Sequence, residues 1–149
     1  PLAVFTLMQE QSFLSLEIVW KDEHMLELEV SASNKFFKGI TQVYDQWECL
    51  LQLSVQLLNF SICSQPVLYE SGEKDSYAYF SLRFYHVTST GVIGVQIHLE
   101  ENVPTEYRPE EKSKITLEIL TELSAIDEFQ KYLRTMVEKQ SGKAQLNGR

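Results

Sequence analysis

The chain has 149 residues, 44% of them hydrophobic and 23% charged, a composition that predicts one globular domain over residues 1–149 and argues against disorder. Its 13 basic and 21 acidic residues give a net charge of -8, which repels nucleic-acid phosphates and favours a basic protein as partner. No apolar run approaches the ~18 residues of a membrane span. The chain begins without a signal-peptide pattern, and Cys49 and Cys63 are expected to be reduced thiols of a cytoplasmic protein.

The first half of the chain has the alternating pattern of β-strands. Residues 2–8 are expected to add an edge strand. Stronger alternation follows at 13–20 and 25–33, and the short polar connection between these segments predicts an antiparallel hairpin. The side chains predicted to face the core are Leu14, Leu16, Ile18, Trp20, Leu26, Leu28, Val30 and Ala32.

The hydrophobic period then changes to that of a helix. Residues 34–39 are turn-like, and 45–60 carry apolar residues at helical spacing. Asp45, with Glu48 three residues later, has the form of a capping box. Cys49 is expected to be a packed or half-buried thiol, since no basic cluster flanks it. The predicted buried stripe of this helix consists of Trp47, Leu50, Leu51, Val55 and Leu58.

A second hairpin is predicted in the middle of the chain, after a loop with a short strand at 67–70. Residues 77–86 and 92–99 alternate, and a turn at Ser89-Thr90 or Thr90-Gly91 joins them. That turn places His98 across from Ser81 or Arg83. The predicted inward side chains are Phe80, Leu82, Phe84, His86, Ile93, Val95, Ile97 and Leu99.

The last third predicts a strand at 113–123 and a helix at 125–139 that Ser124 caps. The tail from about residue 140 is expected to be frayed. The predicted fold class is therefore α+β, a mostly antiparallel sheet of about five to six strands with two main helices packed on one face.

The chain carries no recognisable pattern of catalytic or metal-binding residues. His86 and His98 are predicted to point to opposite sides of their hairpin and so cannot share a metal, and His24 is expected to be solvated. A Gly-x-Ser-x-Gly elbow and a glycine-rich phosphate loop are both missing from the sequence. Glu100 is expected to be solvated beside Glu101. We therefore predict no enzymatic activity, no metal and no cofactor.

The side chains that alternate with the core-facing ones offer a candidate binding surface instead. Tyrosine is enriched at interfaces because its ring gives a large contact area with a polar tip, and carboxylates suit a basic partner. A plain exposed sheet face is the alternative, since tyrosine also favours strands. The predicted partner-binding residues, expected on one side of one sheet, are Tyr77, Tyr79, Arg83, Tyr85, His98, Glu27 and Glu29.

The order of landmarks over residues 25–137 resembles the WapI-type immunity proteins and related bacterial domains. In that group a strand with an (F/Y)-x-G turn leads to a helix, a hairpin follows, and a last helix begins near (I/L)-D-x-F. Phe37 and Gly39 hold the turn positions in this sequence. The hairpin and helix positions are held by Leu82, Phe84, Gly91, Val95, Ile97, Leu99, Ile126, Asp127 and Phe129.

The resemblance implies a cytoplasmic, antitoxin-like protein that blocks a secreted, often nuclease-type toxin by stoichiometric binding. Two alternatives stay open at this point. One is an acidic cytoplasmic chaperone for a secreted effector, a class that usually acts as dimers, and the other is a small-ligand-binding domain. The oligomeric state is not determined by the sequence.

Overall fold

The computed structural model describes residues 11–75, 77–104 and 108–149, so the strand expected at 2–8 lies outside the described residues. The described chain forms two antiparallel sheets of four strands, which we call sheet A (β3-β2-β1-β8) and sheet B (β4-β5-β6-β7). The predicted α+β class and antiparallel pairing are confirmed, but the strands are more numerous than expected and divide between two sheets. The strands are β1 Phe13–Lys21, β2 Leu26–Ser33, β3 Lys38–Asp45, β4 Val67–Gly72, β5 Tyr79–His86, β6 Val92–Glu100, β7 Lys114–Glu122 and β8 Lys143–Asn147.

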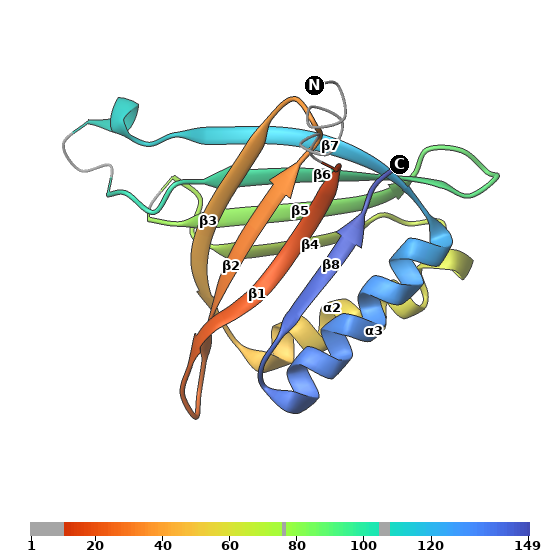
Figure 1. Cartoon of the computed structure of the whole chain (residues 1–149), viewed down its shortest axis with the longest axis horizontal. Coiled ribbons are helices and arrows are strands. Elements are labelled where there is room, and N and C mark those ends of the chain that lie inside the picture. Colours follow the sequence, from red (N-terminus) through yellow and green to blue (C-terminus); the bar gives the residue numbers. More distant parts are fainter. Residues whose placement is uncertain (1–10, 76, 105–107) are drawn as a thin grey trace, which may run out of the picture.

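The two sheets cross one in front of the other, and two helices lie side by side along one open side (Figure 1). The helices are α2 (Trp47–Leu58) and α3 (Leu123–Lys139), and short 3-10 helices occur at Phe60–Ile62 and Pro109–Glu111. One cluster of buried apolar side chains joins the inner faces of both sheets to both helices. The outer face of each sheet therefore points away from the other sheet.

For most strands, the side chains predicted to face the core do so. Every predicted inward side chain of β2 and β6 is buried, as are the three apolar ones of β5. Phe84 of β5 packs toward Phe129 of α3 with 6.4 Å between ring centroids, which places α3 on the inner side of sheet B. Ser81 pairs with His98 and His86 with Ile93, as expected for the hairpin.

Trp20 is an exception, because a β-bulge interrupts β1. The pairing of β1 with β2 shifts between Ile18 and Trp20, so that Trp20 lies opposite Glu27 and on its face of the sheet. One extra residue in a strand moves all later side chains to the other face. The predicted inward orientation of Trp20 is therefore wrong, and its side chain is 46% exposed.

Helix α2 also faces the core differently from the prediction. Of the predicted stripe, Trp47 and Leu50 are buried, but the other three members are exposed and Leu53 and Leu57 take their place. The helix is apolar on two sides, so the sequence period alone does not select the buried one. Asp45 is not its N-cap: it ends β3, and its carboxylate accepts hydrogen bonds from the N–H of Gln46 and the hydroxyl of Tyr69. Likewise, α3 begins after Glu122, so Ser124 does not cap it.

Strand β3 was not predicted, and it connects the two sheets. The Thr41 hydroxyl on β3 donates to the carbonyl of Glu100 on β6 at 2.7 Å. At Gly39, an added Cβ would lie 2.8 Å from the side chain of Ile115 and 3.0 Å from that of Leu99. A larger residue at position 39 would therefore push these two side chains aside, because β3 passes very close to sheet B.

The prediction of a frayed tail is wrong. Strand β8 pairs with β1 along residues 13–17, and its Ala144 and Leu146 are buried. Gln140 ends α3 in a left-handed conformation with a φ of 53°, and Gly142, at φ 106°, continues the reversal into β8. The burial of Ala144 and Leu146 and the backbone pairing with β1 order this segment, although its own sequence pattern is weak.

Candidate functional site

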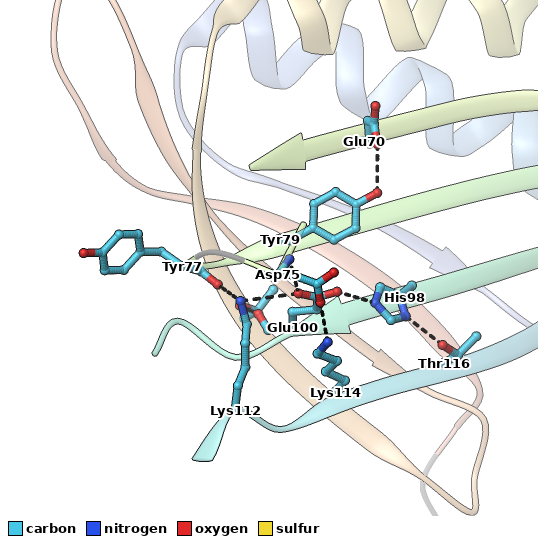
Figure 2. Close-up of polar contacts among 10 residues, drawn as sticks. Glu70, Asp75, Tyr77, Tyr79, His98, Glu100, Lys112, Lys114 and Thr116 are labelled. Carbon is cyan, nitrogen blue, oxygen red and sulfur yellow. Dashed lines mark hydrogen bonds and ion pairs between the residues drawn. The ribbon is translucent and has the colours of Figure 1, made fainter. Parts of the chain in front are cut away.

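The most deeply buried charges lie at the end of β6. Glu100 and Lys112 have fully buried side chains, with Lys112 Nζ 3.3 Å from Glu100 Oε1. His98 Nε2 lies 2.8 Å from Glu100 Oε2, and the N–H of Asp75 donates to Oε1 at 3.0 Å. Lys112 also donates to the carbonyl of Tyr77, so the network holds the loops before β5 and β7 against β6 (Figure 2).

The predicted solvation of Glu100 is therefore wrong. Burial acts to raise the pKa of its carboxyl, but the hydrogen bonds from His98, from the Asp75 N–H and from Lys112 outweigh burial and lower the pKa below its ordinary value. Both carboxylate oxygens are occupied and the side chain does not reach solvent. The network consequently stabilises the two loops, and its Glu100 and Lys112 are not exposed as an acid or a base.

The outer face of sheet B is hollowed into a groove of about 420 Å³. Two cross-strand rows line it, one of Glu70, Ser81, His98 and Thr116 and one of Leu68, Arg83 and Gln96. His98 is held at both ring nitrogens, because Nδ1 lies 2.7 Å from the hydroxyl of Thr116 while Nε2 contacts Glu100. Both helices pack on the inner side of the sheet, which leaves this groove open.

The two tyrosines on this face are bonded to the sheet itself. Tyr79 is only 6% exposed and its hydroxyl donates to Glu70 at 2.8 Å. Tyr85 lies flat over Gly94, where an added Cβ would come within 2.5 Å of the ring, and its hydroxyl donates to Glu118. The bond to Glu118 raises the pKa of Tyr85, and burial followed by the bond to Glu70 raises that of Tyr79. These rings are parts of the packing of sheet B.

The outer face of sheet A has free aromatic rings. The pairing register places Trp20, Glu27 and Tyr44 side by side on three neighbouring strands. Trp20 and Tyr44, which is 56% exposed, meet edge to face with ring centroids 6.0 Å apart. In the next row Glu17 lies directly opposite Glu29. We call the surface formed by Trp20, Tyr44, Glu17, Glu27 and Glu29 the acidic aromatic face.

Tyr77 lies beside this surface. A groove of about 430 Å³ runs between β3 and the connection from β4 to β5, and both Tyr44 and Tyr77 line it together with Gln42 and Glu73. The Tyr77 side chain is 56% exposed. The acidic aromatic face therefore continues through this groove to Tyr77.

The seven predicted partner-binding residues do not form one surface, so that expectation is wrong. Four lie on the outer side of sheet B, Glu27 and Glu29 lie on the outer side of sheet A, and Tyr77 lies at the groove beside sheet A. Their role in binding stays a prediction. Sequence reasoning missed Trp20 because of the bulge and Tyr44 because β3 was not recognised. The β-branched and aromatic residues Ile40, Thr41, Val43 and Tyr44 are the signal that could have indicated that strand.

Other reactive side chains of the described chain include His86, Cys49 and Cys63. His86 stacks on Phe60 at 4.4 Å and points to the side opposite His98, as predicted. Cys49 and Cys63 are free thiols, and burial followed by the charge of Asp45 raises the pKa of Cys49.

Over residues 11–75, 77–104 and 108–149, no group of three or more His, Cys, Asp or Glu is arranged to hold a metal ion. In the same part of the chain, neither helix has the length and apolar character needed to cross a membrane.

Comparison with known proteins assigns no family. No protein-family model, no curated protein and no solved structure matches the chain. The two outer sheet faces are therefore the features from which a function can be inferred.

Proposed function

We propose that the protein is a non-catalytic, cytoplasmic binding module that inhibits a basic toxin by stoichiometric binding, the function that the resemblance to WapI-type immunity proteins implies. The observation that carries the proposal is the acidic aromatic face. Trp20 and Tyr44 present two large rings to solvent next to three carboxylates. Tryptophan and tyrosine are the residue types that most often dominate binding energy at protein interfaces.

The carboxylates of this face favour a cationic partner. Glu17 and Glu29 are directly opposite each other on neighbouring strands, and like charges in that position destabilise a sheet. Lys143 of β8 lies opposite Glu17 on its other side, and Gln42 donates a hydrogen bond to Glu29. A lysine or arginine of the partner placed between the two carboxylates relieves the repulsion that remains. The net charge of -8 adds a long-range attraction that raises the association rate and is weakened by salt.

Sheet A supports the proposal better than the tyrosines of sheet B do. Tyr79 and Tyr85 already donate their hydroxyls to carboxylates of their own sheet. Binding through those rings would require breaking intramolecular bonds. We therefore place the partner on the acidic aromatic face and the adjoining Tyr77 groove.

The test uses, as the candidate toxin, the purified product of a large toxin gene immediately upstream, which is the gene order that the proposal predicts. Titration calorimetry at two salt concentrations should show one-to-one binding that weakens with salt, and binding should abolish the toxic activity. Trp20→Ala and Tyr44→Ala should each weaken binding by roughly 2 kcal/mol, about 30-fold. Their melting temperatures should stay unchanged, because both side chains are exposed.

Tyr132→Ala is the matched control, since Tyr132 is a similarly exposed tyrosine on α3, and it should bind normally. A generic basic protein such as cytochrome c measures non-specific attraction. Affinity that is unaffected by Trp20→Ala and Tyr44→Ala contradicts the proposed surface. Absence of any inhibition by the wild-type protein contradicts the proposed function.

A chaperone for a secreted effector is the second candidate, and one surface favours it. Leu51, Val55 and Leu58 form an exposed apolar stripe on α2, which suits self-association of the kind that such chaperones use. Light scattering separates the two candidates. A monomer argues against the chaperone, whereas a dimer that Val55→Lys dissociates argues for it.

A further inference from the structure

Arg83 occupies an unusual place on the outer face of sheet B. Its guanidinium lies 4.4 Å from the centroid of the Tyr85 ring, and its Nη1 donates to Gln96 Oε1 at 3.3 Å. Among the described residues it forms no ion pair with a carboxylate, although the chain has 21 acidic residues. A ring and a neutral amide thus contact a half-buried cation, and most of its five N–H donors have no partner among the described residues.

The surroundings of Arg83 combine charge with apolar contact. Arg83 lines the groove of about 420 Å³, a size that suits a small ligand. Leu68 lies directly across from Arg83 on β4 and is 67% exposed. The carboxylate that lines the groove, Glu70, accepts a hydrogen bond from Tyr79, and His98 is held by Thr116 and Glu100. Arg83 is therefore the cation that faces an incoming ligand.

We propose that this groove binds a carboxylate attached to an apolar body. The carboxylate accepts hydrogen bonds from the Arg83 guanidinium, replacing the long contact to Gln96, and the apolar body lies on Leu68. Planar pairing with a carboxylate is the interaction for which arginine is best suited. A phosphate fits less well, because its second charge would meet one arginine and the nearby Glu70. The site lies on the face opposite the acidic aromatic face, so it does not depend on the proposed inhibition of a toxin.

The same chemistry occurs in a small organic acid and in the free C-terminus of a peptide, and two probes distinguish these sources. Octanoate represents the organic acid, with octanamide as its neutral control. A short peptide ending in a free leucine carboxylate represents the C-terminus, with the same peptide amidated as its control. Binding is measured by titration calorimetry and by amide chemical shifts along β4, β5 and β6. At least one acid should bind, and its neutral control should bind roughly tenfold more weakly or worse.

Arg83→Gln should weaken binding of the acid roughly tenfold or more, and Arg83→Lys should be intermediate because the charge remains without the planar fork. Arg134→Gln is the matched control. It removes an arginine of α3, the helix on the inner side of sheet B, and should bind as the wild type does. Circular dichroism checks that the variants fold. If Arg83→Gln does not fold, the acid-versus-amide comparison on the wild-type protein decides the matter. Failure of both acids to bind at millimolar concentration, or equal binding of acids and amides, overturns the proposal.

Discussion

The two outer faces of this protein carry similar residues and use them differently. On sheet B the hydroxyls of Tyr79 and Tyr85 donate to Glu70 and Glu118, and the rings lie against the sheet. On sheet A the rings of Trp20 and Tyr44 touch each other at an edge and are otherwise exposed. The difference shows that strand alternation identifies the face of a side chain, whereas its cross-strand neighbours decide whether it is free to bind.

A glycine and a bulge account for much of this difference. Gly94 leaves a space in sheet B that the ring of Tyr85 fills, and any larger residue there would collide with it. In sheet A the bulge after Ile18 turns Trp20 to the outer side, next to Tyr44 on the far side of Glu27. Small local changes of backbone and side-chain volume therefore produce one face whose tyrosines are bonded to the sheet and one face whose rings are exposed.

The largest effect should come from the core on which both faces depend. Phe84 is fully buried between sheet B and α3, so Phe84→Ala should lower the free energy of unfolding by about 3–5 kcal/mol. Leu68→Ala, on the open side of the neighbouring strand, should change it by less than about 0.5 kcal/mol. Urea denaturation measures both. A loss below about 1 kcal/mol for Phe84→Ala would mean that the inner face is not as described.

Glu100→Gln should have the next largest effect, because it removes the buried charge that Lys112 and His98 contact. Removing one partner of a buried ion pair costs about 3–5 kcal/mol. The folded-state pKa of Glu100 is lowered, so its ionisation contributes stability that is complete above the unfolded-state pKa of about 4.3 and is lost as the pH falls through the folded-state pKa. The difference between wild type and variant should therefore be constant near neutrality and shrink in acid.

Denaturation curves at several pH values between about 7 and 2.5 test this, since that range includes the unfolded-state pKa of about 4.3. Glu101→Gln is the matched control, because the neighbouring Glu101 is exposed, and it should change little. A difference that grows as the pH falls would contradict the assigned direction of the pKa shift.

Alanine variants of Tyr77 and Tyr79 should differ in stability by an intermediate amount, because one ring is exposed and the other is buried. Tyr79 is buried, so Tyr79→Ala should cost about 1.5–3 kcal/mol of stability. Tyr77 is exposed, so Tyr77→Ala should cost less than about 0.5 kcal/mol. Thermal denaturation with both variants in parallel gives the comparison. Equal losses would show that the two rings do not differ in burial.

Gly94→Ala should have the smallest effect on stability, but it tests most directly why the Tyr85 ring is held against sheet B. The new methyl group displaces the Tyr85 ring from its position, and the hydrogen bond to Glu118 is broken. We expect a loss of about 1 kcal/mol and a fall in the pKa of Tyr85 from its raised value toward the ordinary value of about 10. NMR titration of tyrosine labelled at the ring carbons, with wild type and variant in parallel, reports this pKa.

Much of the fold could be predicted because it depends on local pattern. The alternation of β2, β5 and β6 correctly identified their inner faces, and the helical period located α2 and α3. For the candidate site, the same alternation correctly placed Glu27, Glu29, Arg83 and His98 on outer faces. It could not show that these residues belong to two sheets, because strand pairing between distant segments leaves no local trace.

By itself, the sequence determined the class of the fold, the inner faces of most strands and the acidic charge, since the hydrophobic effect acts on each alternating segment independently of its partners. Only the tertiary structure decided the features that need a distant neighbour. Strand β8 is ordered by β1, and Glu100 is buried because Lys112 and the loop at Asp75 reach it. The exposed pair of Trp20 and Tyr44 likewise exists only because a bulge in β1 and the pairing of β3 bring the two rings to one side of sheet A.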